Sequence, residues 1–118
     1  MPTLIFYETK SGACPVQNFL DDLINVEHKE SQYLKSDLFI KQLKRYGFDI
    51  NQFQSKAIKP FGEGLWELKP GYIRIFFYYS NRYRAFVILH AYEKDTEQAP
   101  PREVAIAKDR QKEFEERK

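Results

Sequence analysis

The sequence of 118 residues predicts a small α+β domain. It comprises an antiparallel sheet of about four to five strands, an N-terminal helical hairpin packed on one face, and a C-terminal helix. Two observations predict this class. The stretch from Gly64 to Lys94 is dense in β-branched and aromatic residues and is broken by turn residues, as consecutive strands are. Apolar residues recur at helical spacing before and after it, and the chain length suits one domain, residues 1–118.

The N-terminal part predicts one strand and two helices. Thr3–Glu8 is a short strand. A first helix runs from Pro15, which suits a first helical turn, to about Val26. A second helix runs from Glu27 to Tyr46, and Gly47 ends it. The candidate buried positions of the second helix are Tyr33, Leu34, Leu38 and Leu43.

The middle of the chain predicts the sheet. Phe48–Lys56 has no clear period and is a loop, and Ala57–Lys59 is a short strand. The three main strands are Leu65–Lys69, Tyr72–Tyr79 and Tyr83–Tyr92. The last of them is apolar on both faces in its middle, which is typical of a strand inside a sheet.

The C-terminal part predicts a helix opened by Pro100-Pro101. Its apolar positions are few, and the residues expected on the surface are Arg110, Lys112, Glu115, Glu116 and Arg117. Because it is weakly apolar, we expect this helix to be partly detached or flexible at its end. We expect the helices to pack on one face of the sheet and to leave the other face free for a partner.

Alternation along the strands predicts a polar cluster on one face. A turn centred on Asn81 places Arg74 opposite Ile88, and a tight Pro70-Gly71 turn places Glu67 opposite Arg74. Glu67 then lies beside a cluster on the same face whose members are Lys69, Tyr72, Arg74, His90 and Tyr92. A functional site and an ordinary cross-strand ion pair with half-buried tyrosines both fit this pattern.

The positive charge is concentrated in the middle of the chain. The net charge is +2 overall, whereas residues 35–94 carry eleven basic and five acidic side chains, a net charge of +6. Basic side chains among aromatic ones on a sheet are typical of nucleic-acid binding, because cations neutralise phosphates and aromatic rings stack on bases. Solvated surface charges give the same composition.

Several classes of site are not indicated. Cys14 is the single cysteine, and the two histidines are far apart, so no disulfide framework or zinc motif is present. We expect no metal and no cofactor. No apolar run approaches the ~20 residues of a membrane span, and no leader opens the chain, so we expect a cytoplasmic protein with no membrane partner.

Four segments together resemble a known family. They are Leu65–Lys69 (LWELK), Tyr72–Tyr78 (YIRIFFY), Ile88–Lys94 (ILHAYEK) and Pro100–Glu103 (PPRE). Their order and spacing are similar to the HigB-like, phage-derived branch of the RelE/ParE toxin superfamily. The resemblance implies the toxin of a type II toxin-antitoxin system, a ribosome-dependent endoribonuclease (mRNA interferase) that acts on mRNA. It also implies an antitoxin partner, a HigA-like helix-turn-helix protein.

The resemblance implies roles for residues of this chain. The catalytic candidates are Arg74, His90, Tyr92 and Lys94, and the candidates for RNA binding are Lys59 and Lys69. Tyr72 is a further candidate for RNA binding, because a tyrosine ring can stack on a base. This chain departs from the family after Lys94, where acidic residues stand in place of further lysines.

The chemistry requires no metal. Attack by the 2′-hydroxyl of RNA needs a base, cations for the charged transition state and an acid for the leaving oxygen. Arg74 and Lys69 suit the phosphate, and His90 or Tyr92 suits proton transfer, although His90 fits a structural place between strands equally well. A ParE-like toxin that blocks DNA gyrase and a non-catalytic binding module are the alternatives on the same fold.

The basic second helix suggests where the antitoxin binds. An acidic partner would neutralise the positive middle of the chain, and the candidate contacts are Lys41, Lys44 and Arg45.

Overall fold

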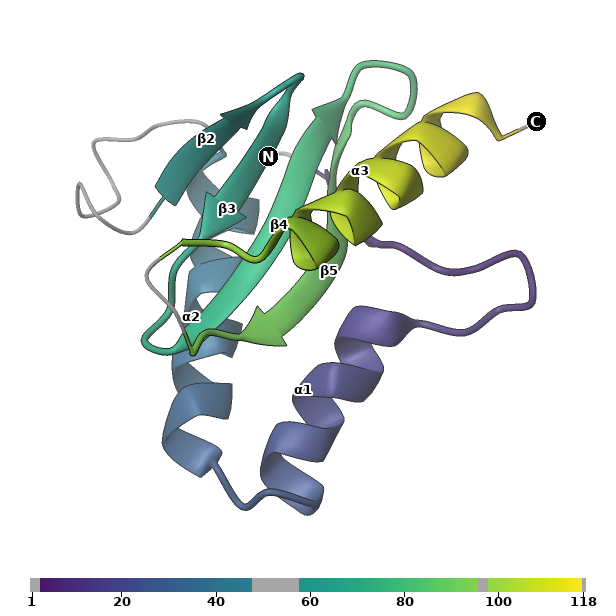
Figure 1. Cartoon of the computed structure of the whole chain (residues 1–118). Helices are drawn as coiled ribbons and strands as arrows, with labels where there is room; N and C mark the ends of the chain where they lie inside the picture. The colour runs from purple at the N-terminus through teal and green to yellow at the C-terminus, as the bar shows by residue number, and fades with distance from the viewer. Residues whose placement is uncertain (1–2, 48–57, 96–97, 118) are drawn as a thin grey trace.

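The computed structural model describes residues 3–47, 58–95 and 98–117. It confirms the α+β class, with helices before and after a five-stranded sheet (Figure 1). The elements in chain order are β1 (Thr3–Phe6), α1 (Pro15–Asn25), α2 (Glu30–Tyr46), β2 (Ile58–Gly62), β3 (Leu65–Leu68), β4 (Ile73–Ser80), β5 (Ala85–Glu93) and α3 (Pro101–Glu116). The predicted loop Phe48–Lys56 lies outside the described residues.

The sheet is mostly antiparallel. Its strand order is β1-β5-β4-β3-β2, and only the β1–β5 pair is parallel. β5 therefore lies inside the sheet, as its apolar sequence predicted, and β2 and β1 form the two edges. The consecutive strands β2 to β5 form a meander, which brings the residues of one sequence stretch side by side.

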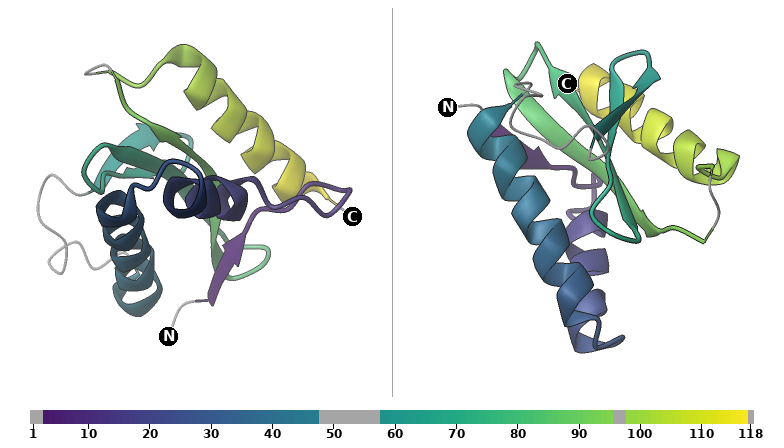
Figure 2. Two further views of the ribbon diagram at one scale, coloured as in Figure 1. Left: turned by 90° about the horizontal axis from the view of Figure 1, so that it is seen from below. Right: turned by 90° about the vertical axis from the view of Figure 1, so that its left-hand side faces the viewer.

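The helices cover both faces of the sheet, and the expectation of a free face was wrong. α1 and α2 lie on one face and α3 on the other (Figure 2). One core cluster packs residues of α1 and α2 against Phe77, Phe86 and Ile88, and a second packs α3 against Phe76 and Leu89. The strands that α3 covers are therefore buried on both faces, which explains their nearly continuous apolar sequence.

Polar side chains attach α3 to the sheet, so the expectation of a partly detached helix was also wrong. Tyr7 donates a hydrogen bond to Glu113 (2.7 Å), and Tyr78 and Ser80 both donate to Glu115 (2.7 Å each). Arg110 reaches the carbonyl of Leu89 at 2.9 Å. These bonds supplement a small apolar contact in which only Ala107 and Phe114 of α3 are buried.

The second helix differs from its prediction at its start and on its outer face. It begins at Glu30 and not at Glu27, because His28 takes a left-handed conformation (φ 57°) that helices exclude. Gly47 ends it as expected, at φ 61° with its N–H donating to Leu43. Leu34 and Leu38, predicted to be buried, are 55% and 52% exposed.

The strand registers differ from the predicted ones. Arg74 pairs with Tyr92 and not with Ile88, and Glu67 pairs with Phe76 and not with Arg74. The loops explain both differences, because each spans four residues between its strands and neither is a tight turn. A bulge adds to the shift: the partner of Phe76 is His90, whereas that of Phe77 is Ile88.

The bulge decides which side chains face α3. Leu89 packs in the cluster beneath α3, and the next residue, His90, also contacts α3. Two consecutive residues can share a face only because the bulge interrupts the alternation. As a result Arg74, His90 and Tyr92 share one face, as the sequence predicted, although their partners were not the predicted ones.

No helix in the described part of the chain is both long and apolar enough to cross a membrane.

Candidate active site

A small pocket of about 40 Å³ lies on the α3 face, toward the β2 side of the sheet. Each strand of the meander contributes to it, and the segment before α3 closes one side. Its lining residues are Lys59, Phe61, Glu67, Lys69, Arg74, Tyr92, Lys94 and Ala99. Four of these eight side chains are cations and one is a carboxylate, so the pocket is strongly positive.

Arg74 is held in place by backbone carbonyls of the loop before β4 and of the first residue of β4. Its Nη1 donates to the carbonyl oxygens of Gly71 (2.7 Å) and Ile73 (2.9 Å). The side chain is 9% exposed. These bonds fix one edge of the guanidinium, which has further N–H groups for an anion in the pocket.

Glu67 is the one carboxylate among the lining residues, and it is 4% exposed. Tyr92 Oη lies 3.4 Å from Glu67 Oε2 and donates to it. Burial raises the pKa of Glu67, while Arg74, the tyrosine hydroxyl and the lysines oppose that rise. The carboxyl group therefore binds a proton more readily than an exposed glutamate does.

Aromatic rings form the wall behind these charges. Phe61 meets Phe76 edge to face at 5.2 Å, and Phe76 stacks on Tyr92 at 5.9 Å between ring centres. The ammonium of Lys59 lies 5.2 Å above the ring of Phe61. Burial and the neighbouring Glu67 raise the pKa of Tyr92, so this tyrosine remains an O–H donor at neutral pH.

The donor set suits an oxyanion better than a metal ion. Four cations face one carboxylate, whereas hard metal ions need several oxygen ligands of negative charge. Within residues 3–47, 58–95 and 98–117, no group of three His, Cys, Asp or Glu side chains could hold a metal ion.

Comparison with protein families matches residues 27–112 to the family described as Phage derived protein Gp49-like (DUF891). The chain belongs to this family. The Gp49-like family is the HigB-like branch of the RelE/ParE toxin superfamily, so the resemblance in the sequence is confirmed. Membership implies a toxin with a cognate antitoxin. A search of curated proteins found no match.

The matched region of this Gp49-like chain contains the whole pocket. Most of the residues that the sequence nominated for RNA contact and catalysis converge there, namely Lys59, Lys69, Arg74, Tyr92 and Lys94. Tyr72 is 68% exposed and does not line the pocket, but its carbonyl accepts a hydrogen bond from the Lys94 N–H at 2.7 Å. Tyr72 is therefore next to the rim.

His90 lies behind the pocket and contacts α3. Its Nε2 is 2.6 Å from Glu103 Oε2, and its Nδ1 is 3.2 Å from Arg110 Nη1. Because arginine can only donate, Nδ1 must accept and Nε2 must carry the proton toward Glu103. Burial, in spite of Glu103, lowers the pKa of His90, which favours this neutral form. The ring stacks on Tyr92 with centres 6.1 Å apart.

The nominated antitoxin contacts lie on α2, which covers the opposite face of the sheet (Figure 2). Lys41, Lys44 and Arg45 are all exposed. Lys41 makes an ion pair with Asp37 (2.8 Å), and the guanidinium of Arg45 lies 5.5 Å from the ring centre of Tyr46.

Sequence reasoning missed four contributors on the α3 face. Glu67 was treated as an ion-pair partner only, and Phe61 and Glu103 were given no role. Arg110 was placed on the surface, but it is half-buried against His90. Alternation along β2 could have placed Phe61 on this face. Lys59 pairs with Glu67, and the side chain of Phe61, two residues further along the strand, points to the same side as that of Lys59.

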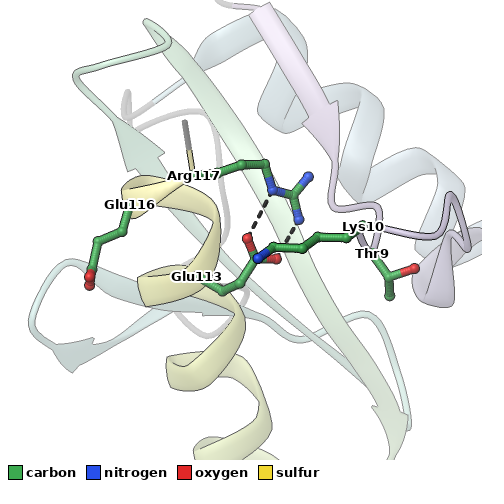
Figure 3. A pocket seen from close by; sticks show the side chains of 5 residues that line it. All are labelled: Thr9, Lys10, Glu113, Glu116 and Arg117. Carbon is green, nitrogen blue, oxygen red and sulfur yellow. Dashed lines mark hydrogen bonds and ion pairs between the residues drawn. The ribbon is translucent and has the colours of Figure 1, made fainter.

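A larger hollow of about 680 Å³ lies elsewhere, between the loop after β1 and the end of α3 (Figure 3). Its lining residues are Thr9, Lys10, Glu113, Glu116 and Arg117. Arg117 and Glu113 point toward each other and form an ion pair (Figure 3). Its charges are of both signs and largely compensate each other, so it lacks the excess of cations that marks the smaller pocket.

Proposed function

We propose that this Gp49-like chain is a ribosome-dependent endoribonuclease, an mRNA interferase that cuts messenger RNA and stops translation. The observation that carries the proposal is the gathering of Lys59, Lys69, Arg74 and Lys94 around Glu67 in one pocket. Four cations suit a phosphodiester and its more highly charged transition state. Membership of a toxin family supports the same assignment.

The proposed reaction is transfer of the phosphate to the neighbouring 2′-oxygen. The Glu67 carboxylate takes the proton of the 2′-hydroxyl, and the 2′-oxygen forms a bond to phosphorus as the bond to the 5′-oxygen breaks. Tyr92 Oη supplies a proton to the leaving 5′-oxygen. The products are a 2′,3′-cyclic phosphate and a 5′-hydroxyl, and no water or metal enters this step.

The environment of each group supports its role. A carboxyl group with a raised pKa is a better base than an ordinary glutamate, and Glu67 is such a group. Tyr92 already donates toward Glu67, and its raised pKa keeps it protonated. Lys69, Arg74 and Lys94 stabilise the charge that develops on the phosphate oxygens.

In this proposal His90 supports Tyr92 instead of exchanging protons with RNA. Both of its ring nitrogens contact side chains of α3, and its ring stacks on Tyr92. Tyr72, exposed beside the rim, is placed to stack on a base next to the cut. Lys59 contacts the RNA backbone from the edge strand.

The test uses purified protein, translating ribosomes and a message of known sequence. Defined cuts that depend on translation, and that end in a 2′,3′-cyclic phosphate, are the expected result. Lys69→Ala serves as the matched variant, because it removes one cation without touching the proposed base. An uncut message together with blocked DNA supercoiling by gyrase would contradict the proposal and favour the ParE-like alternative.

For the antitoxin we propose a helix-turn-helix protein with an acidic, amphipathic segment that binds the outer face of α2. Leu34, Leu38, Lys41 and Arg45 recur at four-, three- and four-residue spacing, so they form one stripe along the helix. The two leucines are more than half exposed, and the basic residues, with Lys44, follow them. A partner helix of apolar and then acidic residues complements this stripe.

Two variants test this docking surface with the cognate antitoxin. Reversal of charge at Lys41, Lys44 and Arg45 should slow association and reverse its dependence on salt, because added salt then screens a repulsion. Leu34→Ser combined with Leu38→Ser should speed dissociation, because apolar anchors mainly set the lifetime of a complex. Unchanged rates in both variants would show that the antitoxin binds elsewhere. If the chain associates with itself and the two serine substitutions abolish this association, the stripe binds a second copy of the chain.

A further inference from the structure

The loop between β3 and β4, residues 69–72, holds the pocket together. Lys69 opens it, and Arg74 follows it by two residues. The N–H of Lys94, the residue just after β5, donates to the carbonyl of Tyr72 at 2.7 Å. Three of the four cations of the pocket therefore depend on the position of this one loop.

The loop is tied from both sides of the sheet. From the pocket side, Arg74 donates to the carbonyl of Gly71 at 2.7 Å. From the other side, Gln32 of α2 reaches across, and its Oε1 accepts the N–H of Tyr72 at 3.1 Å. α2 lies on the face opposite the pocket, so Gln32 is a connection from that helix to the rim of the proposed active site.

Gly71 makes this connection possible. A methyl group on Gly71 would lie 2.6 Å from Gln32 Oε1, well inside van der Waals contact. Gly71 also has a φ of 60°, which favours glycine. The turn therefore favours glycine at this position, and a side chain there would displace the end of the Gln32 side chain from the loop.

A second tie joins the same two regions. Lys29, just before α2, bonds both carboxylate oxygens of Glu93 at 2.7 and 2.8 Å, and Glu93 is the last residue of β5. The N-terminal end of α2 is thus joined to the loop through Gln32 and to the end of β5 through Lys29. Lys94 lies between these two ties.

We infer that Gln32 is a positioning residue, which holds the loop 69–72 from α2 so that Lys69, Arg74 and Lys94 point at one phosphate. The inference rests on the proposed function, which makes the pocket a phosphate site. Gln32 itself is on the far face and touches no substrate. Its loss should loosen the loop and spread the cations without removing any charge from the pocket.

The experiment compares Gln32→Leu, which lacks the acceptor, with Gln32→Glu, which keeps one at the same reach. Gln42→Leu makes the same change elsewhere on α2 and is the matched control. Hydrogen exchange is measured at the amides of Tyr72 and Lys94, and inorganic phosphate is titrated as the probe of the pocket. The hydrogen bond is exposed, so we expect an effect at the lower end of the usual range, about two- to fivefold.

In Gln32→Leu, exchange should quicken at both amides and phosphate should bind about two- to fivefold more weakly. Gln32→Glu should restore slow exchange, and Gln42→Leu should match the parent. The exchange of Lys94 is decisive, because its N–H contacts the loop and not Gln32. Faster exchange at Tyr72 alone would overturn the inference and reduce Gln32 to a local contact.

A parent chain that binds no phosphate would contradict the proposed pocket, while exchange at Lys94 would still decide the role of Gln32.

Discussion

Replacement of Arg74 by alanine should affect both cleavage and stability. The guanidinium is one of the four cations in the pocket, and it is also the donor to two backbone carbonyls, those of Gly71 and Ile73. Alanine therefore removes a phosphate contact and at the same time leaves two carbonyl oxygens without this donor. A residue that served RNA alone would change activity without changing the free energy of unfolding.

The two bonds set the expected loss of stability. A hydrogen bond from a charged donor is worth about 1.5–3 kcal/mol, with the larger values for buried groups. The bond to Ile73 is buried and that to Gly71 is partly buried, while removal of the guanidinium also relieves the cost of its own desolvation. We expect a net loss of about 2–3 kcal/mol, which lowers the melting temperature of a domain this size by roughly 10 °C.

The variant should nevertheless fold, because small domains have about 5–15 kcal/mol of stability. Urea unfolding gives the free energy, and cleavage by translating ribosomes gives the activity. Arg74→Lys is the control: it keeps a charge but lacks the planar group that reaches both carbonyls. Lys69→Ala should reduce cleavage with little loss of stability. If the Arg74→Ala protein unfolds at the same urea concentration as the parent, the claimed contribution of Arg74 to stability is refuted. If it keeps full activity, the claimed contact of Arg74 with the phosphate is refuted.

Three further predictions follow from the titratable groups. Glu67→Gln should slow cleavage at least about a hundredfold. Because the folded-state pKa of Glu67 is raised, its ionisation destabilises the fold as pH rises, so Glu67→Gln should be more stable than the parent at pH 8 and equal to it at pH 3. His90→Gln should leave the pH profile of cleavage unchanged, and a shifted profile would make His90 the base. Hydrogen bonds from Arg117 and Tyr7 lower the pKa of Glu113 to about 2, so the stability that Glu113→Gln loses at pH 7 should vanish as pH falls from about 4.5 through 2.

The sequence predicted the polar face correctly even though both predicted strand registers were wrong. The β3–β4 register was wrong by two positions, and the β4–β5 register near Arg74 by four. Even shifts preserve the face on which a side chain lies, so Arg74, His90 and Tyr92 were still placed together. Loop length decides such registers, and Pro70-Gly71 is not a favoured pair for a two-residue hairpin loop, in agreement with the four-residue loop of the structure.

The contribution of α3 could not be predicted in the same way. Val104, Ala107 and Phe114 form a weak apolar stripe, and nothing local shows which face of the sheet the helix covers. Its position depends on polar bonds to residues far away in the chain, such as Glu113 with Tyr7. The burial of Arg110 follows from that position. Long-range polar contacts carry no periodic signal, so these residues were assigned to the surface.

The balance of charge around Glu67 gives the pocket a property that no single residue has. Burial raises the pKa of this carboxyl group, and Arg74 and the lysines pull it down. A substrate phosphate in the pocket would engage those cations and add negative charge of its own, and both changes favour the protonated carboxyl. Under the proposed reaction, Glu67 therefore becomes a stronger base when RNA is bound. The substrate itself therefore supplies a shift in pKa that favours proton transfer to Glu67.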